Sequence, residues 1–409
     1  MEATSGNNVT LLKNGGELFP AMIAAIDAAQ FEVRVETYIF RDDKGGEAIA
    51  DSLKRAAKRG VAVRVLVDGF GSHTTHPKFF DSLRDAGVTL LLFRPDYRWV
   101  SMRRAHLRRT HRKITLVDAR VAFVGGINLI DDLTESLSDF PRYDYAVQVE
   151  GPVVANIYHA TERLWKLVAW WHVRKMGAKA EIRRWLRRPQ ADLKLINAER
   201  VALANATEKN SHVGNMRAQF LARDNFRNRR EIEEAYLAAI KGATKKILIV
   251  NSYFLPGRRF RRELIAAATR GVEVTLLLQG RADHVLLQMA TRALYEQLLG
   301  VGVKIYEYEK SMMHGKVAAI DDAWATVGSS NLDPFSLFLN REANVVVLDE
   351  AFARDLRLSV EGEIKEGAHQ FQPADWQRRP LIERVKNWLA YGFARVATGW
   401  IGVKGDWLG

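Results

Sequence analysis

The sequence predicts an α/β fold built twice, in which each half is a mixed, largely parallel sheet flanked by helices. Two observations support this. Short β-branched runs alternate with segments whose apolar residues recur at helical spacing. The alternation then repeats: AAIDAAQFEVRVETYIF (24–40) matches AAIKGATKKILIVNSYF (238–254), and AAKRGVAVRVLVDG (56–69) matches AATRGVEVTLLLQG (267–280).

The first half is expected to begin with three helices that alternate with three strands. The helices are predicted at 17–29, 44–59 and 77–86, and the strands at 31–40, 61–67 and 88–93. Gly60 and Gly87 stand where helix ends favour glycine. A β-rich stretch follows, with ITLVD (114–118), VAFVG (121–125) and YDYAVQVE (143–150).

The second half repeats this order. Helices are predicted at 230–242, 258–270 and 284–300, and strands at 245–254, 272–278 and 302–308. Gly271 and Gly302 again mark helix ends. The β-rich stretch comprises VAAID (317–321), WATVG (324–328) and EANVVVLD (342–349).

Two further segments combine tryptophan with basic residues. Residues 153–188 are predicted to form a long helical region, and a polar linker is expected around 189–213. The stretch 381–403 places Val385, Trp388, Leu389, Val396, Trp400 and Val403 near one helical face. Such a helix either lies in a membrane interface or packs on the protein's own core. The expected domains are 9–152, 153–213 (helical insertion and linker), 214–366 and 367–409 (membrane-associating segment).

Composition restricts the partners. The net charge of +13 predicts an anionic partner, either nucleic acid or an anionic membrane surface, unless the chain is merely a basic soluble enzyme. The absence of cysteine excludes disulfides and thiolate chemistry and fits a reducing compartment. The N-terminus lacks the pattern of a signal peptide, and no run of 18 apolar residues predicts a transmembrane helix.

One constellation occurs twice, 203 residues apart. Counted from the histidine, lysine stands at +2, aspartate at +7, glycine at +14 and asparagine at +17 in both copies. About 0.03 accidental matches to His-x-Lys-x4-Asp are expected in such a chain. The copies are His111, Lys113, Asp118, Gly125 and Asn128, and then His314, Lys316, Asp321, Gly328 and Asn331.

Paired histidines predict phosphodiester chemistry. One imidazole attacks the phosphorus and the other protonates the departing alkoxide. Lys113, Lys316, Asn128 and Asn331 are candidate donors to the nonbridging phosphate oxygens. This chemistry needs no metal and no other cofactor, and the two aspartates at +7 lie where they brace a turn. We group Asp118 and Asp321 with the catalytic motifs.

The motifs identify a resemblance to the phospholipase D superfamily, over about residues 9–366. Within it the chain is most similar to bacterial cardiolipin synthases, of the cardiolipin synthase B type without N-terminal transmembrane helices. This likeness rests on THRKITLVDARVAFVGGIN (110–128), HGKVAAIDDAWATVGSSNLDPFSLFLNREANV (314–345), YDYAVQVEGP (143–152) and ETYIF (36–40).

The resemblance implies two phospholipase D-like domains related by a pseudo-twofold axis, with the active site at their interface. It implies that His111 is the nucleophile and His314 the general acid, then base. A carboxylate about 25 to 35 residues after each histidine orients it in the family, which matches Asp144, 33 residues after His111, and Glu342, 28 residues after His314.

Other residues near the motifs have two interpretations each. Glu36 is a supporting group under the site or a buried charge satisfied by a motif lysine. The arginines before and within the first motif either capture anionic lipid headgroups or form a solvated charge run. They are Arg103, Arg104, Arg108, Arg109 and Arg112.

The expected function is that of a cardiolipin synthase, which transfers a phosphatidyl group from one phosphatidylglycerol to another through a phosphohistidine and releases glycerol. The alternatives are a phospholipase D hydrolase or headgroup-exchange enzyme and, less favoured, a nuclease. The expected partners are phosphatidylglycerol and the membrane surface, without nucleic acid or an obligate protein partner. The expected location is peripheral, on the cytoplasmic side of the bacterial inner membrane.

Overall fold

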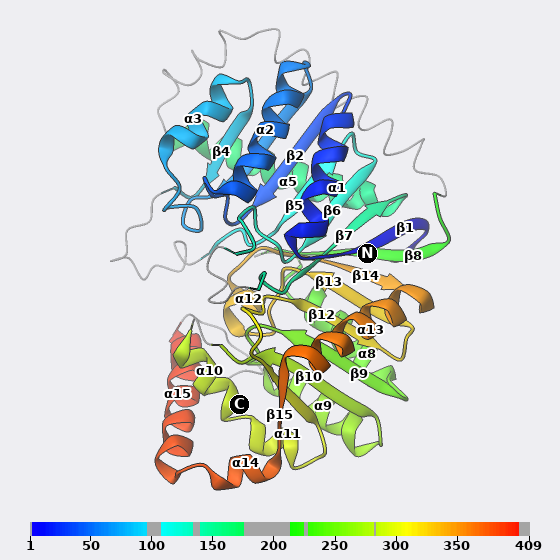
Figure 1. Cartoon of the computed structure of the whole chain (residues 1–409), viewed down its shortest axis with the longest axis vertical. Helices are drawn as coiled ribbons and strands as arrows, with labels where there is room; N and C mark the ends of the chain where they lie inside the picture. Colours follow the sequence, from blue (N-terminus) through cyan, green and yellow to red (C-terminus); the bar gives the residue numbers. More distant parts are fainter. Residues whose placement is uncertain are drawn as a thin grey trace. The chain divides into compact units, whose positions relative to one another are not determined.

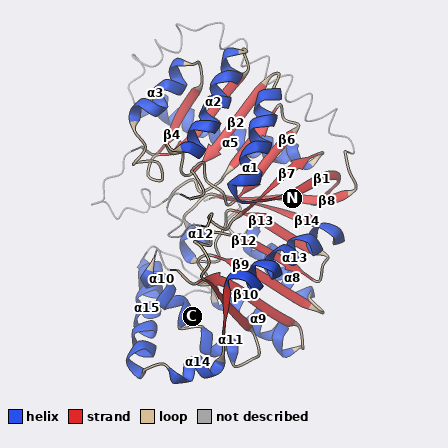
Figure 2. Ribbon diagram, viewed as in Figure 1, coloured by secondary structure: helices blue, strands red, loops and turns tan. Residues whose placement is uncertain are grey.

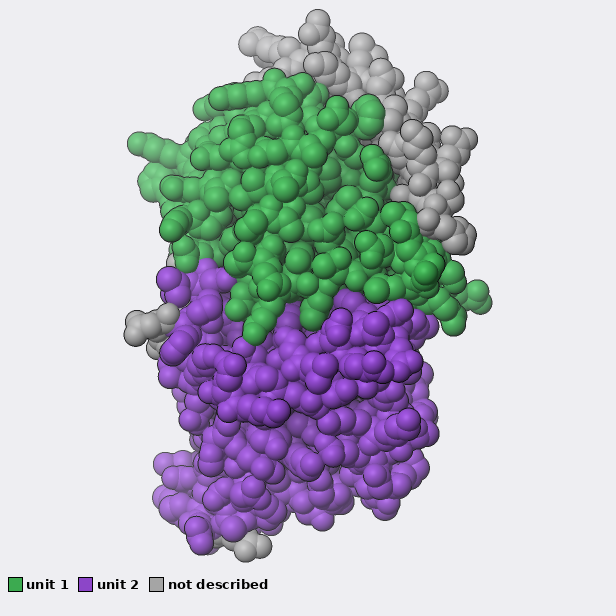
Figure 3. Space-filling view, turned by 45° about the vertical axis from the view of Figure 1, so that its right-hand side comes forward, with its two compact units in different colours: residues 1–101, 109–131, 146–220 green, residues 102–108, 132–145, 221–409 purple. Residues whose placement is uncertain are grey.

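The fold was analysed in a computed structural model. It describes residues 2–95, 108–133, 140–175, 213–224, 228–281 and 284–400. The chain divides into two compact units: residues 1–101, 109–131 and 146–220 form the first, and residues 102–108, 132–145 and 221–409 form the second (Figure 3). The stretch 132–145 therefore belongs to the second unit although it follows the first motif.

The sheet of the first unit is mixed (Figure 1). Its strands run in the order β1-β7-β6-β5-β2-β3-β4. The neighbours β2, β3 and β4 are parallel, whereas β5, β6 and β7 are antiparallel to their neighbours. The bounds are β1 Thr4–Lys13, β2 Glu32–Thr37, β3 Ala62–Asp68, β4 Thr89–Phe93, β5 Ile114–Val117, β6 Val121–Gly125 and β7 Tyr145–Glu150.

Helices cover both faces of this sheet (Figure 2). Because side chains alternate along a strand, Val63, Val65 and Val67 of β3 join one core with α1 and α2, whereas Leu66 packs with Leu164 of α5. The helices are α1 Asn14–Ala28, α2 Lys44–Lys58, α3 Pro77–Asp85 and α5 Val153–Lys175.

The second unit has the same strand pattern. Its order is β15-β11-β10-β9-β12-β13-β14, in which β9, β10 and β11 are parallel and the other pairs are antiparallel. The bounds are β9 Lys246–Asn251, β10 Glu273–Gln279, β11 Lys304–Tyr308, β12 Lys316–Ile320, β13 Trp324–Gly328, β14 Glu342–Leu348 and β15 Ala368–Phe371. Strand β8 (Met216–Arg223) spans the division between the units and pairs with β1 through its first residues.

Helices again form layers around this sheet. One core joins α8, α9, α10, α11 and α15 to Val274, Leu276 and Leu278 of β10, and α13 packs against β12 and β13. The helices are α8 Glu231–Gly242, α9 Arg258–Thr269, α10 Val285–Arg292, α11 Tyr295–Leu299, α12 Pro334–Phe338, α13 Glu350–Gly367, α14 Pro373–Arg378 and α15 Leu381–Trp400.

The predicted mixed α/β repeat is confirmed, with a parallel part of three strands in each unit. The single helix predicted at 284–300 is wrong, because the chain turns at the buried Ala293 and Leu294 and forms α10 and α11. The strands β1, β8 and β15 were not predicted. Of the long helix predicted at 153–188 the structure describes the part up to 175, and most of the predicted linker also lies outside the described residues.

The glycines predicted at helix ends are confirmed. Gly60, Gly87, Gly271 and Gly302 have φ values of 91°, 100°, 89° and 86°. A side chain is disfavoured in this left-handed region, so glycine ends each helix at low cost. The same device therefore closes a helix before a strand in both units.

Candidate active site

The first motif begins just before β5. His111 lies three residues before the first residue of this strand, Ile114. The ammonium of Lys113 donates a hydrogen bond to the carbonyl oxygen of His111 at 2.8 Å. The ring of Tyr38 lies edge-on to the imidazole, with 4.9 Å between ring centroids. Lysine and histidine are thus held together by a hydrogen bond within the motif.

The second motif contains a buried carboxylate–imidazole pair. Nδ1 of His314 lies 2.6 Å from Oδ2 of Asp144, and the two residues are 8% and 2% exposed. A carboxylate at Nδ1 favours the tautomer in which Nδ1 carries the proton and Nε2 is free for chemistry. Lys316 again donates to the carbonyl oxygen of its histidine, and lies 3.4 Å from the hydroxyl of Ser252.

This pairing differs from the one that the spacing suggested. Counting along the chain matched Asp144 with His111, whereas the structure brings it to His314. The physical reason is main-chain pairing: the N–H of His314 donates to the carbonyl oxygen of Tyr143 at 2.7 Å, and Tyr143 and Met313 form a β-bridge. The residue after Tyr143 is thereby fixed beside the second histidine.

Glu342 is fully buried at the start of β14. The hydroxyls of Ser329 and Ser336 donate to its two oxygens at 2.6 and 2.7 Å. The nearby guanidinium of Arg223, itself 1% exposed, also interacts with this carboxylate electrostatically; burial lowers the pKa of Arg223 to about 10, against the influence of Glu342. The surroundings therefore hold Glu342 rigidly, and its action on a histidine stays a prediction.

The two motif asparagines are both buried. Oδ1 of Asn128 accepts the backbone N–H of Ile39 at 3.2 Å. Oδ1 of Asn331 has no hydrogen-bond partner in the described part of the chain, and the N–H of this residue donates to Ser336. Phosphate binding by these amides stays a prediction.

The motif aspartates bind the backbone at the end of the strand away from the histidine. Asp118 accepts the N–H groups of Gln30, Phe31 and Glu32, each at 2.8 Å. Asp321 accepts those of Thr244, Lys245 and Lys246 at 2.6 to 2.9 Å. Their contacts are those of the predicted turn brace, so the structure gives them no place beside the histidines in the catalytic set.

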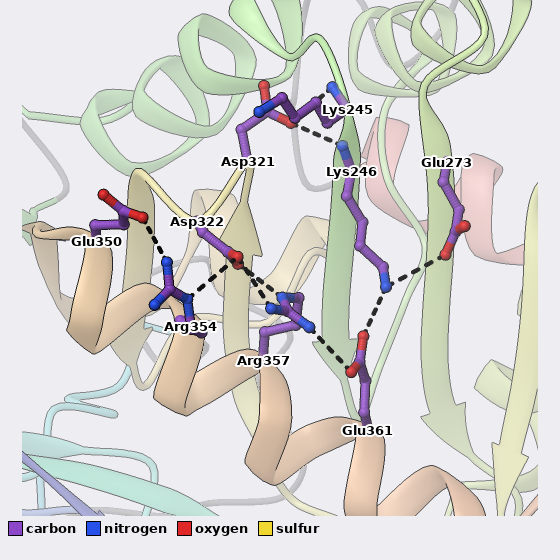
Figure 4. Close-up of polar contacts among 9 residues, drawn as sticks. All are labelled: Lys245, Lys246, Glu273, Asp321, Asp322, Glu350, Arg354, Arg357 and Glu361. Atoms are coloured by element: carbon purple, nitrogen blue, oxygen red, sulfur yellow. Dashed lines mark hydrogen bonds and ion pairs between the residues drawn. The ribbon is translucent and has the colours of Figure 1, made fainter.

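The turn at Asp321 continues into a network of ion pairs (Figure 4). Arg357 of α13 binds both carboxylate oxygens of Asp322, at 2.7 and 3.0 Å, and also Glu361. The ammonium of Lys246 donates a hydrogen bond to Glu361 at 2.6 Å and also forms an ion pair with Glu273 on β10. The hairpin of the second motif is thereby tied to α13 and to two parallel strands.

Two of the arginines near the first motif are buried and have internal partners. Arg109 donates to the carbonyl oxygen of Arg94 at 3.0 Å. Arg112 lies 3.6 Å from the buried carboxylate of Glu36 and 3.5 Å from the carbonyl oxygen of Ala160. These contacts contradict lipid capture by Arg109 and Arg112. Glu36 thus faces an arginine of the motif, while Arg103 and Arg104 lie outside the described residues.

Sequence reasoning missed two residues that hold the entry to each motif. Asp68 ends β3, and its Oδ2 accepts the N–H of Thr110 at 2.9 Å. Gln279 ends β10, and its Oε1 accepts the N–H of Met313 at 2.9 Å. The signal was present, because the aligned repeats VLVDG and LLLQG place these two residues at the same position.

The last helix has two faces of different character. Ala390, Tyr391 and Ala394 of α15 are buried in the core of the second unit. Its large apolar side chains are about half exposed or more, and they are Leu381, Ile382, Val385, Trp388, Leu389, Phe393 and Val396. Trp170 and Trp171 of α5 are also exposed, at 54% and 58%. Packing on the protein's own core is thus confirmed for one face of the helix, and the membrane interface stays a prediction for the other.

Within the described ranges, no helix combines the length and apolar character needed to cross a bilayer. Over the same residues, no three or more side chains of histidine, cysteine, aspartate or glutamate gather as a metal ion would require.

Comparison with known proteins gives a consistent result. The family model described as "Cardiolipin synthase, PLD-like domain" matches residues 22–164 and 236–362. Cardiolipin synthase B of Salmonella typhimurium is 38% identical over 402 residues, which cover 97% of this chain and 90% of the relative. Cardiolipin synthase B of Escherichia coli K12 is 37% identical over 399 residues, with the same two coverages.

A solved structure shares the fold at low identity. The crystal structure of phosphatidylserine synthase from Haemophilus influenzae aligns with a TM-score of 0.67 and 13% identity, covering 98% of this chain and 96% of that one. This likeness supports the fold alone.

The network at the second hairpin predicts a pH-dependent contribution to stability. The hydrogen bond from Arg357 lowers the pKa of Asp322 below its usual 3.8, so the contribution is present above that pH and is lost as pH falls through the lower folded value. Arg357→Leu should lower the free energy of unfolding by about 1 to 2 kcal/mol at neutral pH. Chemical denaturation should show that this loss shrinks near about pH 3.

Arg259→Leu is the matched control, because Arg259 pairs with Glu234 on an exposed surface. Its effect should be smaller. Equal effects of both variants, or a loss by Arg357→Leu that is independent of pH, would contradict the prediction.

Proposed function

We propose, from the premise that the chain belongs to the cardiolipin synthase family with phospholipase D-like domains, that it is a phosphatidyltransferase that makes cardiolipin. It takes a phosphatidyl group from one phosphatidylglycerol and gives it to a hydroxyl of a second one, with release of glycerol. The 37% and 38% identity to two cardiolipin synthases B, which extends over 97% of the chain, supports this reaction. The hydrolysis or headgroup exchange that we weighed as alternatives would use the same residues.

The proposed chemistry uses the two motif histidines in turn. A ring nitrogen of His111 attacks the phosphorus of the donor lipid, the bond from phosphorus to the glycerol oxygen breaks, and His314 gives that oxygen its proton. His314 then takes the proton of the acceptor hydroxyl, whose oxygen attacks the phosphohistidine. Cardiolipin forms and His111 is free again.

The observation that carries this division of roles is the pair of Asp144 and His314. A buried carboxylate stabilises the protonated imidazole, and a histidine that alternates between acid and base must pass through that form. Lys113, Lys316, Asn128 and Asn331 are proposed to donate to the phosphate oxygens as charge develops. The two lysines are already fixed by the carbonyl oxygens of their own histidines.

We further propose that residues 367–409 attach the enzyme to the cytoplasmic surface of the inner membrane. The exposed apolar face of α15 and the net charge of +13 support this, because apolar burial and attraction to anionic lipid act together at a membrane interface. Phosphatidylglycerol is then both substrate and docking surface. Neither nucleic acid nor another protein has a part in the proposal.

Product analysis tests the reaction. The purified chain, incubated with vesicles that contain phosphatidylglycerol, should produce cardiolipin and glycerol in equal amounts. Separation of the lipids by chromatography measures this. Phosphatidic acid without cardiolipin would establish the hydrolase instead, and cleavage of DNA with no lipid product would establish the nuclease.

A change of leaving group tests the roles of the histidines. His111→Ala and His314→Ala should each lower turnover of phosphatidylglycerol by about a thousandfold or more. With phosphatidyl-p-nitrophenol, whose leaving group needs no proton, His314→Ala should recover a burst of one p-nitrophenol per enzyme, whereas His111→Ala should release none. Asp144→Asn should also lower turnover of phosphatidylglycerol, but by less than His314→Ala does. A burst from His111→Ala but not from His314→Ala would exchange the roles.

Point substitutions on α15 test the attachment. Removing the helix would uncover the core around Ala390 and Tyr391, so substitution is the sharper change. Leu389→Glu combined with Phe393→Glu should weaken binding to phosphatidylglycerol vesicles by about tenfold or more. Leu358→Glu on α13, where Leu358 is 52% exposed, is the control and should bind as before in a sedimentation assay. Unchanged binding of the double variant would refute the attachment.

A further inference from the structure

A side chain at the end of a parallel strand holds the backbone before each motif histidine. In the first unit Asp68 accepts the N–H of Thr110, the residue before His111, at 2.9 Å. In the second unit Gln279 accepts the N–H of Met313, the residue before His314, at 2.9 Å. The donors and acceptors in both contacts are buried. A random packing contact would not recur at the same position of both repeats.

The carboxylate in the first unit also holds a second part of its surroundings. Oδ1 of Asp68 accepts the N–H groups of Phe70 and Gly71, at 2.9 and 3.2 Å. A Cβ atom added at Gly71 would lie 2.3 Å from the carbonyl oxygen of Tyr38, so this turn lies directly against Tyr38. Tyr38 in turn packs on the ring of His111. Asp68 therefore supports His111 both through the main chain and through the turn under Tyr38.

We propose that Asp68 and Gln279 are positioning residues for the motif histidines, and that the carboxylate makes the first half-site depend on ionisation whereas the amide does not. The proposal rests on the proposed function only in assuming that the two histidines do the chemistry. Neither residue is assigned contact with the substrate.

The difference between the two side chains follows from their hydrogen-bonding capacity. An ionised carboxylate has two accepting oxygens, and Asp68 uses both for N–H groups. A proton on either oxygen would point at an N–H donor, so the protonated form cannot keep all three bonds. Gln279 offers one accepting oxygen, which serves Met313 at every ordinary pH.

The surroundings of Asp68 shift its pKa to a pH at which enzyme activity can be measured. Burial raises the pKa of Asp68 to about 6, against the lowering effects of Arg109 and of the N–H groups of Thr110, Gly71 and Phe70. The guanidinium of Arg109 is the charged group that faces the carboxylate, at 3.6 Å. The three bonds of Asp68 should therefore weaken together as the pH falls below about 6.

Hydrogen exchange of the two entry segments tests the positioning without any assay of activity. Asp68→Ala should raise the exchange rate of the peptide that contains Thr110 by about tenfold and leave the peptide that contains Met313 unchanged. Gln279→Ala should give the reverse. Leu53→Ala, which destabilises the core of the first unit elsewhere, is the control for a general loss of stability. Equal changes in both peptides, or none in either, would overturn the proposal.

The pH profile of turnover tests the role of ionisation. Because the ionised form of Asp68 is the one that positions His111, the logarithm of kcat/KM of the wild type should fall more steeply below about pH 6 than that of a variant without this carboxylate, by about one unit of slope. Asp68→Asn should turn over more slowly than the wild type, should retain more activity than Asp68→Ala, and should show a slope smaller than that of the wild type by about one. Gln279→Ala should lower kcat/KM but keep the slope of the wild-type pH profile. Gln279→Glu, which adds a second ionisable carboxylate, should make that slope steeper.

The outcomes separate the two proposals. If the wild type makes no lipid product while exchange responds as expected, the proposed function fails and the positioning stands. If the wild type is active but Asp68→Asn keeps the slope of the wild type, the ionisation is irrelevant and the proposal fails. Activity losses that follow thermal stability, as for Leu53→Ala, would reduce both residues to structural supports.

Discussion

The hydrogen bonds from three consecutive backbone N–H groups to one motif aspartate are the constraint on which each half-site depends. Asp118 binds the start of β2, and Asp321 binds the start of β9. In each unit the bound strand is the antiparallel neighbour of the strand that follows the histidine, so the aspartate fixes the register between them. A slip of one residue would turn every side chain to the other face of the sheet. The histidine lies just before the opposite end of that strand, and its place therefore depends on an interaction a strand's length away.

The two half-sites share this frame and differ in the groups placed on it. The imidazole of the first packs against Tyr38, whereas that of the second meets the carboxylate of Asp144. At the strand ends, a carboxylate in the first unit corresponds to an amide in the second. A buried carboxylate stabilises the protonated form of the imidazole beside it, as at His314.

Periodicity and repetition were enough to predict the mixed α/β units, most of their helices and the motif residues. The single helix predicted at 284–300 failed because nothing in its sequence marks the turn at Ala293 and Leu294, which tertiary packing imposes. The contact between Asp144 and His314 was missed for a related reason. Spacing gives only the number of residues between two positions in the chain. The β-bridge between Tyr143 and Met313 determines that the carboxylate of Asp144 lies beside His314. Local sequence patterns are enough to predict helices, strands and turns. Contacts between segments that are distant in the sequence can be identified only once the three-dimensional fold is known.

The faces of α15 are arranged opposite to those of an ordinary surface helix. Two alanines and one large residue, Tyr391, face the core, whereas most of the large apolar side chains, such as Trp388 and Leu389, face outward. A helix that only completed a core would turn its large side chains inward, where each contributes about 1.5 to 3 kcal/mol when fully buried. This arrangement instead reserves most of the apolar surface of the helix for a second environment. Such a surface, on a chain with a net charge of +13, is suited to an anionic membrane in which the lipid substrates themselves reside.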